Sequence, residues 1–132
     1  MTMSNLFLEN EPVEQAPEAP QYTLLVVDDE PKVLSAIQRA FRRESYRVLT
    51  AGSAAEALEI MSSESVQLVI TDHRMPGMTG AELLTEIRAR WPDTIRIMLT
   101  GYADVQSIMG AVNDGAVFKF MTKPWIDEDL RV

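Results

Sequence analysis

Charged and hydroxyl residues follow four separate apolar runs of the sequence. The clearest case is Leu24–Val27, which leads directly into Asp28, Asp29 and Glu30. Carboxylates this close together repel one another and raise one another's pKa, so a fold keeps them for solvation at a surface or for binding a cation. The residues that follow the other three runs are Asp72, then Thr100 with Gly101, and finally Thr122 with Lys123 and Pro124.

Oxygen ligands and one ammonium group suit a hard divalent cation that is bound together with an anion. If the groups meet, three aspartates supply carboxylates, Thr100 a hydroxyl and Lys123 an ammonium. Mg²⁺ fits this set best, because it takes oxygen ligands octahedrally, keeps several waters and binds through one or two carboxylates plus a phosphate; Mn²⁺ is the ion that could replace it. A mononucleotide is disfavoured, since it needs a Gly- or Ser/Thr-rich phosphate loop where this chain has carboxylates.

The elements between these groups must bring them together. Apolar or β-branched runs predict strands over 23–27, 47–50, 68–71, 95–99 and 117–121. Helical spacing predicts helices around 33–41 and over 53–61, 80–90 and 104–114. Ser53 and Glu56 would form a capping box, and Gly115 would be a C′ residue. The alternation implies parallel strands and right-handed crossovers in a three-layer α/β/α sandwich, whose ligands bind beyond the carboxyl ends of the strands.

Composition limits the functions that this chain can have. Its 132 residues, 46% of them hydrophobic, fit one domain with a buried core. The absence of cysteine excludes disulfides, and no apolar run approaches the roughly 20 residues of a membrane span, so a cytoplasmic location is expected. The net charge of −8 argues against direct binding to nucleic acid or to an anionic membrane. Residues 1–21 contain four Glu, three Pro and no Lys or Arg, and are expected to form a disordered leader before a domain over 22–132.

The ordered set Asp28-Asp29, Asp72, Thr100 and Lys123-Pro124 resembles the receiver domain of two-component response regulators, over about residues 22–132. The resemblance implies a flavodoxin-like, doubly wound (βα)5 fold whose five-stranded parallel sheet has the order 2-1-3-4-5. The fifth helix would begin after Pro124 and is cut short within about two turns, so the chain is expected to be a fragment of a longer protein. The segments 99–104 and 118–125 are most similar to receivers fused to HD-GYP phosphodiesterases or to hydrogenase-type transcription regulators.

The same resemblance implies roles for the polar residues. Asp72 would be the phosphoacceptor, which takes a phosphoryl group from a phosphohistidine on a sensor histidine kinase or phosphotransfer protein. Asp29 and Asp72 would bind Mg²⁺ directly, with the backbone carbonyl of Arg74 as a third ligand and Asp28 acting through water. Lys123 would pair with Asp72 and, together with the metal, offset the charge of the transferred group. The domain would thus catalyse its own phosphorylation and dephosphorylation.

Switching would depend on the ends of the last two strands. Thr100 would hydrogen-bond the phosphoryl group and draw its loop inward, and Phe120 would follow into the vacated space, although a half-buried strand also explains an aromatic residue there. The Lys123–Pro124 bond would be cis, an arrangement that proline permits but does not favour. The helix over 104–114, the strand over 117–121 and the final helix would form the face for a C-terminal output domain or for a homodimer.

Further residues lie in the loops that follow Asp72 and Thr100. His73 receives no role. Arg74 and Tyr102 resemble positions that tune the rate of dephosphorylation in the family. The glycines at 77 and 80 are interpreted as giving backbone freedom to a turn.

Two other functions were weighed against the phosphorylated receiver. A Mg²⁺-dependent phosphatase of the haloacid-dehalogenase class has an Asp-x-Asp-x-Thr motif, and the segment that follows Asp72 lacks its second acid. A phosphorylation-independent pseudo-receiver, acting as a protein-interaction module, usually lacks the acceptor, a metal carboxylate or the lysine. This chain retains all three, which favours the receiver that is phosphorylated.

Overall fold

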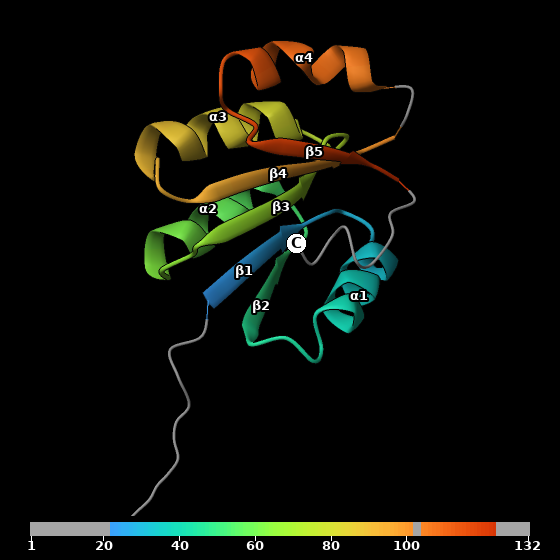
Figure 1. The fold of residues 1–132 in the computed structure, drawn as a ribbon, viewed down its shortest axis with the longest axis vertical. Coiled ribbons are helices and arrows are strands. Elements are labelled where there is room, and N and C mark those ends of the chain that lie inside the picture. The colour runs from blue at the N-terminus through green and yellow to red at the C-terminus, as the bar shows by residue number, and fades with distance from the viewer. Residues whose placement is uncertain (1–21, 102–103, 124–132) are drawn as a thin grey trace, which may run out of the picture.

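The computed structural model describes residues 22–101 and 104–123 (Figure 1). The leader expected over 1–21, Tyr102, Pro124 and the fifth helix expected after it lie outside this part of the chain. None of the helices in the described part is long and apolar enough to cross a membrane.

Five parallel strands form a single sheet in the order β2-β1-β3-β4-β5, which confirms the predicted doubly wound α/β topology. Strands β1 and β3 are therefore neighbours at the centre of the sheet, and their register pairs Val27 with Thr71. The next residues, Asp28 and Asp72, are brought to the same edge as a result. The strands are β1 (Tyr22–Val27), β2 (Tyr46–Ala51), β3 (Leu68–Asp72), β4 (Ile95–Thr100) and β5 (Lys119–Thr122).

Helices cover both faces of the sheet (Figure 1), and an apolar cluster on each face holds them in place. Successive side chains of a strand point to opposite faces, so Leu25 and Val27 belong to one cluster and Leu24 and Val26 to the other. Helices α2 (Ala54–Ser63), α3 (Gly80–Arg90) and α4 (Val105–Asn113) contribute to the first cluster, and α1 (Pro31–Ala40) contributes to the second. These are the three layers that the sequence predicts.

Within the described residues, side chains cap the N-termini of two of the four helices. The Ser53 hydroxyl accepts the Glu56 N–H at 3.1 Å, but the Glu56 carboxylate accepts the N–H of Gly52 rather than that of Ser53, so the predicted capping box is only half formed. A complete capping box, which the sequence analysis did not identify, joins Thr79 and Glu82 at the start of α3. Helix α3 therefore has a firmly defined beginning, close to the end of β3.

Strand β5 begins at Lys119, two residues later than the sequence pattern predicts. The N–H groups of Ala116 and Val117 donate to the carbonyl of Ala111 at 2.9 and 3.4 Å, so these residues close α4 instead of extending the sheet. Gly115 has a φ of +83°, which confirms its predicted place just beyond the C-terminus of that helix.

Candidate functional site

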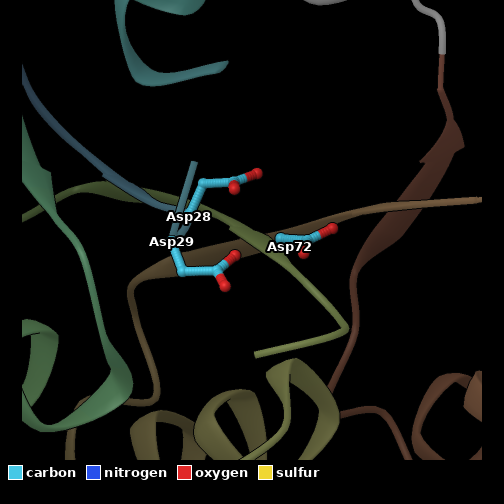
Figure 2. A group of neighbouring side chains, drawn as sticks. All are labelled: Asp28, Asp29 and Asp72. Carbon is cyan, nitrogen blue, oxygen red and sulfur yellow. The ribbon is translucent and has the colours of Figure 1, made fainter. Parts of the chain in front are cut away.

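Three carboxylates lie together where β1 and β3 end (Figure 2). Asp28 and Asp29 follow β1, Asp72 is the last residue of β3, and one oxygen of each lies within 4.8 Å of the others. Asp28 is buried, with 2% of its surface exposed, whereas Asp29 is exposed. The acidic run that follows β1 therefore points into a shared cluster rather than only into solvent.

The backbone and Lys123 hold Asp28 in its buried position. Its N–H donates to the carbonyl of Ala51 at 3.1 Å, which continues the pairing of β1 with β2. Its Oδ1 accepts the N–H of Glu30 at 2.9 Å, and its Oδ2 accepts Lys123 Nζ at 3.1 Å. Because each carboxylate oxygen has a donor, the burial of this charge is compensated.

Lys123 joins two of the acids across the sheet. Its Nζ lies 3.0 Å from Asp72 Oδ1 as well as 3.1 Å from Asp28 Oδ2. Its N–H donates to the Thr100 carbonyl at 2.9 Å, so the end of β4 positions the loop that carries the ammonium.

The pKa values of this pair follow from burial and charge. Burial raises the pKa of the Asp72 carboxyl above its ordinary value, and the Lys123 ammonium opposes this without cancelling it. Burial acts to lower the pKa of Lys123, but the carboxylates of Asp72 and Asp28 outweigh it, so this pKa is raised. At neutral pH the lysine is therefore a fixed positive charge beside Asp72.

The composition of the cluster fits a divalent cation. Three carboxylates face one ammonium, so negative charge remains in excess, and every acidic ligand atom is a hard oxygen. Mg²⁺ prefers such ligands and keeps waters in the positions that the protein does not fill. The three carboxylates could thus together hold a metal ion beside Asp72.

The two residues expected to switch lie on neighbouring strands. Thr100 is fully buried at the end of β4, where its hydroxyl donates a long hydrogen bond of 3.4 Å to the Gly101 carbonyl. Phe120 on β5 is half-buried and packs against the cluster beneath α2, α3 and α4. The expected cis bond involves Pro124, which lies outside the described residues.

An ion pair beside the acidic cluster was not foreseen from the sequence. The Arg74 guanidinium donates from Nε to both carboxylate oxygens of Asp104, at 2.9 and 2.8 Å, and from a terminal nitrogen to one of them at 2.7 Å. The Arg74 side chain is 77% exposed and that of Asp104 only 11%. The pair joins the loop that follows Asp72 to the first turn of α4. Its residues are 30 positions apart, and no local pattern links them.

Gly80 has a different role from the one that its place in a turn suggests. A Cβ atom added there would lie 2.2 Å from the Asp72 carbonyl oxygen, and the Gly80 N–H donates to the His73 carbonyl at 2.9 Å. Only a glycine allows α3 to begin this close to the end of β3. Backbone freedom explains Gly77, whose φ is +80°, but for Gly80 the interpretation was wrong, because space is the constraint there.

Comparisons with known proteins agree with this architecture. Residues 24–132 match the family model of the response regulator receiver domain. The hydrogenase transcriptional regulatory protein HoxA of Cupriavidus necator is 42% identical over 110 residues, which make up 83% of this chain and 23% of HoxA. The chain belongs to the response regulator receiver domain family. It spans less than a quarter of the length of the curated relatives it matches.

Two solved structures show the same fold. The receiver domain of an HD domain-containing protein from Pseudomonas fluorescens Pf-5 aligns with a TM-score of 0.80 and 34% identity, covering 85% of this chain and 90% of that one. The response regulator TrrA of Thermotoga maritima, in complex with Mg(2+)-BeF, aligns with a TM-score of 0.75 and 32% identity, covering 84% and 94%. A hydrogenase regulator, one of the two kinds of relative expected from the sequence, is thus among the matches, as is an HD domain-containing protein.

Proposed function

We propose that this chain is a Mg²⁺-dependent receiver that takes a phosphoryl group from a phosphohistidine onto Asp72. The observation that carries the proposal is the contact of Asp72 with Lys123 at 3.0 Å inside a cluster of three carboxylates. The complex of TrrA with Mg(2+)-BeF supports it, because TrrA has the same fold and is solved with Mg²⁺ and a beryllium fluoride bound. The donor would be a sensor histidine kinase or a phosphotransfer protein.

Transfer would make a bond from Asp72 to phosphorus as the bond from phosphorus to the histidine nitrogen breaks. The leaving imidazole keeps that electron pair. Lys123 is already placed to hold an oxygen of the phosphoryl group, and its fixed charge offsets part of the negative charge spread over those oxygens. Mg²⁺, when bound, would supply the rest of the positive charge. Burial raises the pKa of Asp72, and the Lys123 ammonium opposes this rise by favouring the ionised carboxylate, which is the form that acts as a nucleophile.

The metal ligands follow from how each acid is engaged. Asp29 is exposed and Asp72 ends β3, so both can offer an oxygen directly, with the carbonyl of Arg74 as the third protein ligand. Both oxygens of Asp28 already accept hydrogen bonds, from Glu30 and Lys123. Direct coordination by Asp28 would break one of these bonds, which favours contact through water.

Phosphorylation would then change the face formed by α4, β5 and the helix expected after Pro124. The Thr100 hydroxyl, whose hydrogen bond to the Gly101 carbonyl is long at 3.4 Å, would reach the phosphoryl group, and Phe120 lies on the neighbouring strand. The signal would pass to a C-terminal output domain or to a homodimer, in the cytoplasm and without nucleic-acid binding by this segment. The low share of each curated relative that the chain covers is consistent with such a further domain.

Intact-protein mass spectrometry after incubation with Mg²⁺ and acetyl phosphate tests the proposal. We expect a labile gain of one phosphoryl group that is absent without Mg²⁺ and in Asp72→Ala. Asp93→Ala, a change of an exposed aspartate in the connection that precedes β4, is the control and should be phosphorylated like the wild type. If the wild type gains no adduct and does not bind beryllofluoride, the chain is a pseudo-receiver and the proposal is wrong.

The metal is tested separately by thermal unfolding. Millimolar Mg²⁺ should raise the melting temperature, because the ion relieves repulsion among the three carboxylates. Asp29→Asn should abolish this rise, whereas Glu30→Gln should retain it, since Glu30 is exposed and outside the cluster. An equal rise in the Asp29 variant would refute the assignment of the metal site.

A further inference from the structure

In the part of the chain that the structure describes, three helices have Ser, Thr or Asp at the N-cap, and they begin in two different ways. Ser53 and Thr79 have extended backbones, with ψ of 162° and 165°, and each accepts the N–H of the residue three positions later. Asp104, at the same position of α4, has a ψ of 0° and makes no side-chain hydrogen bond to its helix. Aspartate is among the best N-cap residues, so the absence of this bond requires a cause.

Two observations account for it: the Asp104 N–H already donates to the Gly101 carbonyl at 3.0 Å, which turns its backbone into a helical conformation, and Arg74 occupies its carboxylate. The Asp104 carboxylate accepts three hydrogen bonds from the Arg74 guanidinium, so both of its oxygens are occupied. The first N–H groups of α4 thus lack the carboxylate acceptor that an aspartate at the N-cap normally provides. The carboxylate of Asp104 therefore has two competing sets of donors, the guanidinium and the N-terminus of α4.

We propose that Asp104 exchanges these partners when Asp72 is phosphorylated. In the unphosphorylated protein it binds Arg74. In the phosphorylated protein Arg74 turns to the phosphoryl group, and Asp104 rotates to cap α4. This inference rests on the proposed function, because it requires a phosphoryl group on Asp72.

The position and exposure of Arg74 make the exchange physically reasonable. Arg74 is two residues beyond Asp72 in the same loop, and at 77% exposure its side chain is free to turn. Phosphorylation adds a charge of about −1.5 to −2 and three strong acceptor oxygens. A guanidinium binds such a group through two parallel hydrogen bonds, as it binds the carboxylate now. The phosphoryl group thus competes with Asp104 for the same donors.

The exchange would give α4 two defined states. The released carboxylate would accept the N–H of Gln106 or Ser107, which requires the backbone of Asp104 to adopt the extended conformation seen at Ser53 and Thr79. A new charge at Asp72 would thus become a change at the first turn of α4. Arg74 and Asp104 would be positioning residues for the switch, not residues that carry out the transfer.

Amide hydrogen exchange at Gln106 and Ser107, measured by NMR on the full chain, tests this inference. Without a phosphodonor, these two amides should exchange roughly fivefold more slowly in Arg74→Ala than in wild type. This factor corresponds to the free energy of one typical N-cap. Exchange at the same amides should also be slow in Asp104→Asn, because Asn caps a helix but binds a guanidinium weakly. In the double variant with Arg74→Ala and Asp104→Ala, exchange at these amides should be no slower than in wild type, because no carboxylate is left to cap the helix. The amide of Glu82, already bonded to Thr79, is the internal control and should not change.

Wild-type protein incubated with Mg²⁺ and acetyl phosphate should show the same slowing, with the adduct confirmed by mass on the same sample. Equal exchange in unphosphorylated wild type and Arg74→Ala would overturn the competition for Asp104, as would slowing in the double variant. An adduct without slowing would overturn the exchange on phosphorylation. Absence of any adduct would instead refute the proposed function, while the comparison of the unphosphorylated variants would still decide whether Arg74 competes with the helix.

Discussion

Arginines hold helix α4 at both ends, but they bind chemically different groups. At the N-terminus, Arg74 binds the charged carboxylate of Asp104 from an exposed position. At the C-terminus, Arg88 donates to the carbonyl of Asp114, and Arg96, with 9% of its surface exposed, donates to the carbonyls of Gly115 and Ala116. The first contact joins two full charges, and the second caps the negative end of a helix dipole.

The difference indicates which end of α4 can respond to a phosphoryl group. An added anion beside Asp72 competes with Asp104 for Arg74, because both are anionic acceptors. It does not compete for Arg96, which lies on β4 with further hydrogen bonds to the carbonyls of Pro92 and Thr94. The C-terminal end of α4 should therefore stay fixed while the N-terminal end changes partners.

The largest effect is expected from Arg96→Met, which removes the fixed end. The substitution leaves four carbonyls without this donor. Two of them belong to the buried residues Thr94 and Ala116, where an acceptor that loses its partner is costly. The free energy of unfolding, measured with urea, should fall by about 2–4 kcal/mol. This loss is expected even though burial and the nearby Arg88 lower the pKa of Arg96 and thus disfavour its charge, because the hydrogen bonds to the carbonyls outweigh that cost.

Arg47→Met is the matched control for this substitution. Arg47 also lies on a strand, but it is exposed and pairs with the partly exposed Glu64 at 2.8 Å. Its loss should cost less than about 1 kcal/mol. If the two substitutions lowered the free energy of unfolding by similar amounts, the carbonyl contacts of Arg96 would stabilise the fold no more than an exposed ion pair does.

Gly115→Ala should have a smaller effect at the same end. The residue has a φ of +83°, where alanine is strained, and its Cβ would lie 3.3 Å from the Arg88 guanidinium. We expect a loss of about 1–2 kcal/mol in the free energy of unfolding. Gly110→Ala, within α4 and with nothing near the added Cβ, is the control and should stabilise the chain by up to about 1 kcal/mol. A stable Gly115 variant would mean that the C-terminal end is not tightly held.

Much of the fold could be predicted because it depends on short-range patterns. Alternation of apolar runs with helical spacing predicted five strands and four helices, and the rule that ligands bind beyond parallel strand ends predicted which side chains would lie at one edge. Asp28, Asp29 and Asp72 do lie together there, with Lys123 beside two of them. The start of β5 was misplaced because the hydrogen bonds that close α4 compete with those of the sheet, and residue types alone do not reveal the outcome.

The contacts at the two ends of α4 could not be predicted in the same way. Arg74 and Asp104 each look like solvated surface charges, and only the folded chain brings them together. Arg96 did carry a signal, since a lone charged residue interrupts the apolar run of β4, and such a residue must find partners when buried. Those partners are main-chain carbonyls, which every residue has, so no sequence motif marks them.

The smallest expected effect is a difference between the two ends of α4 in their response to pH. Hydrogen bonds and charge from Arg74 hold the pKa of Asp104 below its ordinary value of 3.8. The ion pair therefore stabilises the fold at pH values above the pKa of the unfolded chain, and this contribution is lost as the pH falls through the lower folded value. The coupling free energy from a double-mutant cycle of Arg74→Ala and Asp104→Asn should be constant from pH 7 to 5 and should decline below about pH 4. The cost of Arg96→Met should not follow this decline, because a guanidinium bound to carbonyls does not titrate in this range. If the coupling persisted undiminished at pH values where Asp104 is protonated, the N-terminal contact would not be ionic, and the contrast between the two ends of the helix would fail.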